Sequence, residues 1–72
     1  MNFKKYWTKQ KERKISEHDI VTLKVKLSDV PSGSKGTVIH VYPNNKTYEV
    51  EFIKSGNFSV VKTLLKEHLE VS

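Results

Sequence analysis

The clearest alternation of apolar and polar positions lies in the middle of the chain. Tyr48, Val50 and Phe52 alternate with polar residues, which is typical of a half-buried β-strand. The run before it is rich in β-branched residues, which also favour strands. Pro43-Asn44-Asn45 separates the two runs and suits a tight turn, because Pro presets a negative φ and Asn tolerates a positive φ. We therefore predict a β-hairpin over residues 36–53.

The first strand of this hairpin departs from strict alternation. Val38 and Val41 are three residues apart, whereas two apolar residues on one face of a regular strand are separated by an even number of positions. A β-bulge or a sharp bend near Ile39-His40 would restore both residues to the same face. Small barrels need such bends to close.

The rest of the chain predicts three more strands. Alternation over residues 20–27 indicates a strand with Lys24 and Lys26 on its wet face, and residues 28–35 form a loop rich in Pro, Gly and Ser. After a turn at residues 54–57, a strand over residues 58–64 places Phe58, Val60 and Leu64 on one face.

The end of the chain is too short for a stable α-helix. The segment Leu65-Lys66-Glu67-His68-Leu69 is expected to form one 3₁₀ turn with Leu65 and Leu69 pointing inward. A short last strand over residues 70–72 would follow it.

Residues 1–14 differ in character from everything that follows. Phe3, Tyr6, Trp7 and Gln10 have helical spacing, so this segment is expected to be a short N-terminal arm, helical or flexible. We divide the chain into a basic, aromatic arm over residues 1–15 and a β-domain over residues 16–72.

The net charge of +5 belongs to the arm. Residues 1–14 hold six basic residues and one acidic residue, whereas residues 15–72 hold seven of each. The chain therefore combines a basic arm with a neutral domain. It has no Cys, no apolar segment typical of a signal peptide and no run long enough to span a membrane, so we expect a cytoplasmic protein.

These elements resemble a small, five-stranded, all-β SH3-like barrel. Residues 18–71 also resemble a family of small, mostly bacterial proteins known only as a domain of unknown function, and the Gly-Thr-Val-x-x-Val core is similar to the KOW motifs of ribosomal proteins and transcription elongation factors. The segments that carry the resemblance are His18-Asp19-Ile20-Val21 with Leu23, Gly36-Thr37-Val38-Ile39-His40-Val41-Tyr42, Tyr48-Glu49-Val50-Glu51-Phe52, and Leu64 to Leu69.

The resemblance implies a fold more than a function. Members of that family are often small stand-alone proteins, sometimes encoded beside toxin-like or nuclease-like genes, which implies an antitoxin or immunity role. The family's members tend to be acidic and to lack a long leader, whereas this chain has a neutral domain and adds the basic arm. The resemblance supplies no catalytic or binding residues.

The residue types and their spacing argue against an enzyme. No nucleophile elbow, phosphate-binding loop or metal-ligand spacing is present, so we expect no catalytic residues, no cofactor and no metal site. His18, His40 and His68 fall in three separate elements and are expected to be structural or surface residues. Glu49 and Glu51 share one sheet face, which we expect to be solvated.

A loop and the arm are the candidates for binding. In SH3-like barrels the first loop often lines the ligand face, which makes residues 31–35 a candidate. In the arm, basic side chains could contact phosphates and aromatic rings could stack on bases or contact a protein. The candidate partner-binding residues are Lys4, Lys5, Tyr6, Trp7, Lys9, Lys11, Arg13 and Lys14.

Three interpretations of the arm stay open. The aromatic side chains could pack on an open end of the barrel, bind a protein or a nucleic acid, or lie at an anionic membrane surface. We expect a non-catalytic binding module that acts through a protein partner, of the antitoxin, immunity or host-modulating type. The alternative is a KOW-like module that binds nucleic acid or the ribosome through the arm. The chain is expected to be a monomer, or a dimer joined through an exposed edge strand, for which the strand over residues 20–27 is a candidate.

Overall fold

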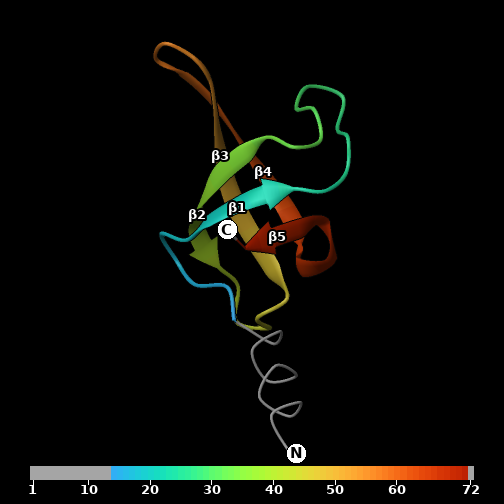
Figure 1. Cartoon of the computed structure of the whole chain (residues 1–72). Coiled ribbons are helices and arrows are strands. Elements are labelled where there is room, and N and C mark those ends of the chain that lie inside the picture. Colours follow the sequence, from blue (N-terminus) through green and yellow to red (C-terminus); the bar gives the residue numbers. More distant parts are fainter. Residues whose placement is uncertain (1–13, 72) are drawn as a thin grey trace, which may run out of the picture.

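The computed structural model describes residues 14–71, which fold into one antiparallel β-sheet of five strands in the order β4-β3-β2-β1-β5 (Figure 1). This confirms the expected all-β class. The elements are β1 (Ile20–Leu23), β2 (Lys35–Val41), β3 (Thr47–Ser55), β4 (Phe58–Leu65), the 3₁₀ turn η1 (Lys66–His68) and β5 (Leu69–Val71). Most of the arm, residues 1–13, lies outside the described residues, and so do the helix expected there and the docking of its aromatic rings.

The β2–β3 hairpin forms where it was predicted. Asn45 has a φ of 58°, which is the positive value that the turn requires. The side-chain oxygen of Asn44 accepts hydrogen bonds from the backbone N–H groups of Lys46 at 2.8 Å and Thr47 at 3.1 Å, as in an Asx turn. The Tyr48 hydroxyl donates to the Asn45 carbonyl at 2.9 Å and ties the turn to the core.

The predicted bulge in the first hairpin strand is also present. Val38 pairs with Val50, but His40 pairs with Glu49, so the register shifts between Val38 and His40. One extra residue, Ile39, therefore lies on β2 at this point.

The strand predicted over residues 20–27 was too long at its C-terminal end. β1 stops at Leu23, and the next N–H, of Lys24, donates to the carbonyl of His68 in η1 instead of continuing a ladder. β1 also lies inside the sheet, between β2 and β5. The expectation that this strand could join a dimer as an exposed edge is therefore wrong, because the two edges are β4 and β5.

The sheet does not close into a barrel within residues 14–71. β5 pairs only with β1, and no ladder joins β4 to β5 among the described strands. The loop between β1 and β2 covers the open side instead: Val30 is 2% exposed, and Asp29 forms an ion pair with Lys62 of β4 at 2.9 Å. The backbone carbonyl of Asp29 also accepts a hydrogen bond from the Lys54 ammonium.

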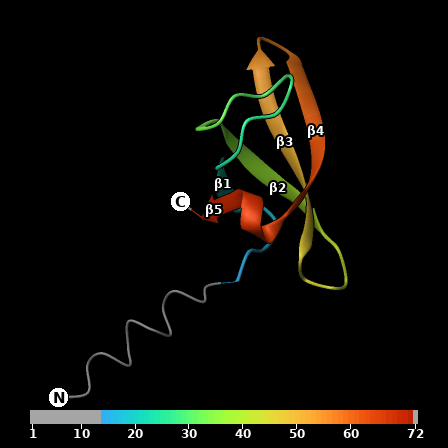
Figure 2. The same ribbon diagram turned by 90° about the vertical axis from the view of Figure 1, so that its right-hand side faces the viewer.

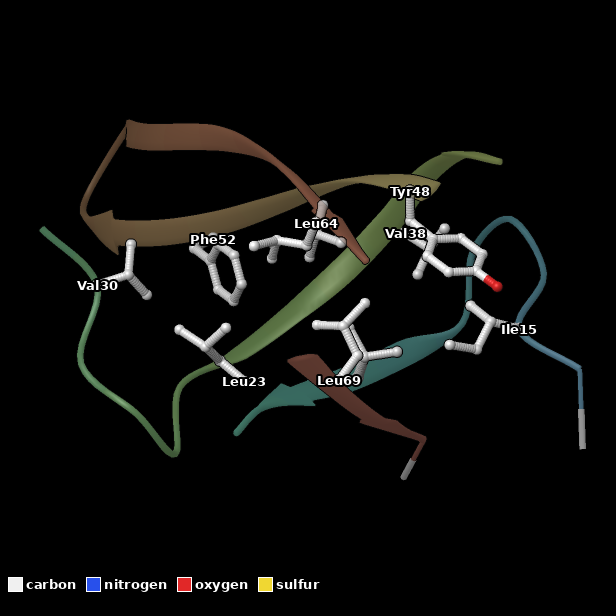
Figure 3. Packing of buried hydrophobic residues seen from close by; sticks show 10 residues of the cluster. Ile15, Leu23, Val30, Val38, Tyr48, Phe52, Leu64 and Leu69 are labelled. Carbon is white, nitrogen blue, oxygen red and sulfur yellow. The ribbon is translucent and has the colours of Figure 1, made fainter. Parts of the chain in front are cut away.

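The core lies along the concave side of this curved sheet (Figure 3). Val30 and Phe52 lie at one end, and Ile15 and Tyr48 at the other. Ile15 precedes the predicted boundary at Ser16 and is only 4% exposed, so it packs with the core. The buried hydrophobic residues are Ile15, Val21, Leu23, Val30, Val38, Tyr48, Val50, Phe52, Leu64 and Leu69.

Two apolar residues of β4 do not point into this core as expected. Leu64 is buried, but Phe58 is 70% exposed and Leu65 is 42% exposed. Phe58 lies at the tip of the β3–β4 hairpin, which extends beyond the rest of the sheet (Figure 1), so the core does not reach it. Leu65 pairs with Thr47 on the face opposite the core.

Candidate functional site

The arm residues proposed for binding lie almost entirely outside the described residues. Lys14 is the only one of them in the described part of the chain, and it is exposed next to the buried Ile15. The other candidates, Lys4, Lys5, Tyr6, Trp7, Lys9, Lys11 and Arg13, lie outside the described residues.

The best-defined surface of the domain is the sheet face opposite the core, here called the outer face. Side chains alternate between the faces, so Glu49 and Glu51 of β3 lie on the outer face while Val50 is buried. The register brings Thr37 and Val61 to either side of Glu51. The outer face is therefore built by neighbouring strands with a fixed register.

Hydrogen bonds orient both carboxylates of this face. One Glu49 oxygen accepts from the Tyr42 hydroxyl and, at 3.1 Å, from the Thr63 hydroxyl. A Glu51 oxygen accepts from the Ser59 hydroxyl at 2.9 Å. Both glutamates are half-buried, and Ser59 and Thr63 beside them are exposed, so the face expected to be solvated is also ordered by hydrogen bonds.

Tyr42 joins this network to His40. The two rings meet edge to face, with centroids 4.9 Å apart and an interplanar angle of 80°. The hydrogen bond to Glu49 raises the pKa of Tyr42 above its usual value, because the bond is lost when the phenol ionises beside a carboxylate. Tyr42 thus holds both His40 and Glu49 in place at one end of the outer face.

Four of the exposed aliphatic side chains on the outer face form one group with the carboxylates. Ile39 is next to the bulge, Ile20 and Val61 lie on strands to either side of Thr37 and Glu51, and Ile53 lies toward the hairpin tip. We call this set the outer patch: Ile20 (45% exposed), Ile39 (44%), Ile53 (71%) and Val61 (48%). A shallow concavity of about 210 Å³ lies among these residues, between Ile20, Thr37, Glu51 and Ile53.

The first loop, whose residues 31–35 were a candidate, borders a second depression. It measures about 310 Å³ and lies between Pro31 and Ser34 on the loop side and Phe52 and Lys54 on β3. The Ser34 hydroxyl donates to the Pro31 carbonyl at 2.8 Å, so this serine serves the turn. The depression is continuous with Ile53 and thus with one end of the outer patch.

The histidines occupy separate local positions. The His18 N–H donates to the Val38 carbonyl at 2.7 Å, and Nδ1 of His68 accepts from the N–H of Leu65 at 3.1 Å. Within residues 14–71, no three His, Cys, Asp or Glu side chains lie close enough to hold a metal ion. In the same residues, no helix is long and apolar enough to cross a membrane.

Residues 17–71 match the model of a protein family described as a domain of unknown function, DUF4926. The chain belongs to this family. The matched region of the DUF4926 domain includes all five strands, but not the arm over residues 1–15. No curated protein and no solved structure showed a significant similarity to the chain.

The DUF4926 match agrees with the resemblance noted over residues 18–71. The family description names no activity, ligand or partner. Sequence reasoning placed Glu49 and Glu51 on one face but missed their partners Tyr42, Thr63 and Ser59. The alternation of Ser59, Val61 and Thr63 on the predicted fourth strand was the available signal.

Proposed function

We propose that this protein is a non-catalytic binding module that acts through a protein partner. The observation that carries the proposal is the outer patch: four exposed aliphatic side chains surround two carboxylates that are already oriented by hydrogen bonds. Protein interfaces combine apolar contact with a few fixed polar groups, and pre-oriented groups lose little entropy on binding. An open, shallow face of this kind suits another protein better than a small substrate.

The charge of this face favours a partner that presents basic side chains among apolar ones. Glu49 and Glu51 place two carboxylates on this face, although the whole chain carries a net charge of +5. Toxic nucleases are one such class of basic partner, so an antitoxin, immunity or host-modulating role in the cytoplasm is part of this proposal.

An SH3-like, KOW-like relationship is also part of the proposal. The strand order β5-β1-β2-β3-β4 and the 3₁₀ turn before the last strand support it. In such folds the surface near the first loop often binds ligand, and here that loop borders the Ile53 end of the outer patch.

The proposal is tested by quantitative affinity capture from the source cell. The double variant Ile20→Ser/Ile39→Ser removes apolar contact from the outer face. Val25→Ser is the matched control, because Val25 is an exposed aliphatic residue (37%) outside that face. We expect at least one protein to be recovered in equal amounts with wild type and Val25→Ser, and in about tenfold lower amount with the double variant. Identical recovery with all three chains would contradict a role for the outer patch.

The second candidate function is nucleic-acid or ribosome binding through the arm. It rests on one observation, that residues 1–14 carry the entire net charge of the chain. Binding of labelled RNA and DNA should then weaken steeply with salt and be lost when residues 1–14 are deleted, with Ile15 kept because it is in the core. The double variant Lys24→Gln/Lys26→Gln, which removes two exposed charges elsewhere, should bind normally. No binding at low salt, or no effect of the deletion, would exclude this function.

A further inference from the structure

β4 is an edge strand with an open side. Within residues 14–71 it pairs with β3 alone, along eight register positions from Thr47↔Leu65 to Ser55↔Phe58. Figure 2 shows β4 at the rim of the sheet, with no described strand beyond it. Such an edge presents backbone N–H and C=O groups that can pair with another strand.

This edge carries little protection against pairing. Edge strands are commonly guarded by Lys, Pro or an inward-pointing charge. The one guard of this kind on β4 is Lys62, which lies opposite Val50 on the core-facing side, and its charge is compensated by the ion pair with Asp29 at 2.9 Å. The remaining residues are apolar or carry hydroxyl groups, and Phe58, Val61 and Leu65 are well exposed. β4 therefore combines high β-propensity with little net charge.

We propose that β4 pairs antiparallel with β4 of a second copy of this chain, about a two-fold axis at Val61. Two residues that face each other across the pair must lie on the same side of the sheet, so their positions in the strand differ by an even number. One residue then lies midway between them, on the two-fold axis, and faces the same residue of the other copy. An axis at Lys62 would place two lysines opposite each other. An axis at Val61 instead places Val61 against Val61, with Lys62 opposite Val60.

The Val61 register is self-complementary along the strand. On the outer face Ser59 lies opposite Thr63, and their hydroxyls suit a cross-strand pair. On the other face Phe58, which is 70% exposed in the single chain, comes opposite Leu64. The two five-stranded sheets become continuous, and both outer patches lie on the same side of the combined sheet. This pairing does not depend on the proposed protein partner.

Single cysteines test both the pairing and its register, because the chain contains no Cys of its own. In an antiparallel pair the Cα atoms of facing residues are about 4.5–5.5 Å apart, which permits a disulfide. Val61→Cys should therefore cross-link on mild oxidation. Thr63→Cys is the matched control, exposed on the same face of β4. Its two copies would be about 14 Å apart, too far for a disulfide.

We expect Val61→Cys to give at least tenfold more disulfide dimer than Thr63→Cys at equal concentration. Sedimentation of the cysteine-free chain should show a concentration-dependent dimer that Val61→Lys shifts to monomer and Val61→Thr preserves. Equal cross-linking of both cysteines, or preferential cross-linking of Thr63→Cys, would overturn the register. A monomer at all concentrations would overturn the dimer. If, in such a monomer, the β4 amides that point away from β3 were still protected from hydrogen exchange, another segment would occupy the edge in place of a second β4.

Discussion

At the scale of single residues, Gly36 is required for space and not for backbone freedom. A Cβ atom there would lie 2.7 Å from a Val50 methyl, 2.8 Å from the Phe52 ring and 2.9 Å from the Glu51 carbonyl. The last of these is backbone and cannot rotate away. β2 and β3 therefore pack at a distance that only glycine permits.

Gly36→Ala should destabilise the domain by about 1–3 kcal/mol, the usual cost of overpacking a core. Gly56→Ala is the control: Gly56 has a φ of 55° and nothing within 4 Å of its would-be Cβ, so only backbone strain of about 1–2 kcal/mol applies. Urea unfolding monitored by circular dichroism measures the free energy of unfolding of both variants. A stability of Gly36→Ala equal to that of the wild type would contradict the packing described.

The ionisation of Tyr42 can be followed by a pH titration and reports on its hydrogen bond in the outer face. Its pKa is raised, first by its hydrogen bond to Glu49, so its contribution to stability is present below pH 10 and is lost as the pH rises through the folded-state pKa. Glu49→Gln should move the absorbance transition of one tyrosine to lower pH. Glu70→Gln, at an exposed residue of β5, should leave the curve unchanged. An unchanged curve for Glu49→Gln would mean that the hydrogen bond is absent in solution.

At the scale of elements, the β2–β3 turn depends on two adjacent asparagines with different roles. The Asn44 side chain accepts two backbone hydrogen bonds, and Asn45 adopts the positive φ of the turn. Asn45→Gly should be tolerated because glycine adopts a positive φ freely, whereas Asn45→Val should cost about 1–2 kcal/mol because a β-branched residue does not. Thermal unfolding of the two variants checks this. Equal melting temperatures would show that the turn does not require the left-handed conformation.

The hairpin could be predicted from sequence because its signals are local. The alternation that ends at Phe52 indicates which side chains face the core, and the two asparagines indicate the turn. The odd spacing of Val38 and Val41 indicates the bulge. The other elements depend on pairing, which local patterns do not encode. The alternation of β1 continues to Leu27, yet its ladders end at Leu23.

Two features of the site and core escaped prediction for the same physical reason. Ile15 is a lone apolar residue among charged ones and has no periodicity, so only the fold shows that it is buried. The partners of Glu49 depend on the register between β2, β3 and β4, which a single strand's pattern does not fix.

At the scale of the whole molecule, the first loop covers the open side of the sheet and is held there by the ion pair between Asp29 and Lys62. The ion pair with Lys62 is the main cause that lowers the pKa of Asp29 below 3.8. A lowered folded-state pKa contributes stability above the unfolded value, and that stability is lost as pH falls through the folded value.

Asp29→Asn should therefore lower the melting temperature slightly at neutral pH, and the difference from wild type should shrink as the pH falls below about 4. Glu70→Gln serves as the control at an exposed carboxyl. A difference between Asp29→Asn and wild type that is constant from pH 7 to pH 2 would show that the ion pair does not hold the loop.

We propose above that the outer face of the sheet binds a protein. A photo-crosslinking amino acid placed at position 39, inside the outer patch, tests it directly in the source cell, with the same amino acid at position 25 as the control. Both positions are exposed, and only Ile39 lies on the outer face. We expect a discrete protein adduct at position 39 that is absent at position 25. No adduct at position 39, the same adducts at both positions, or adducts with nucleic acid alone would contradict it.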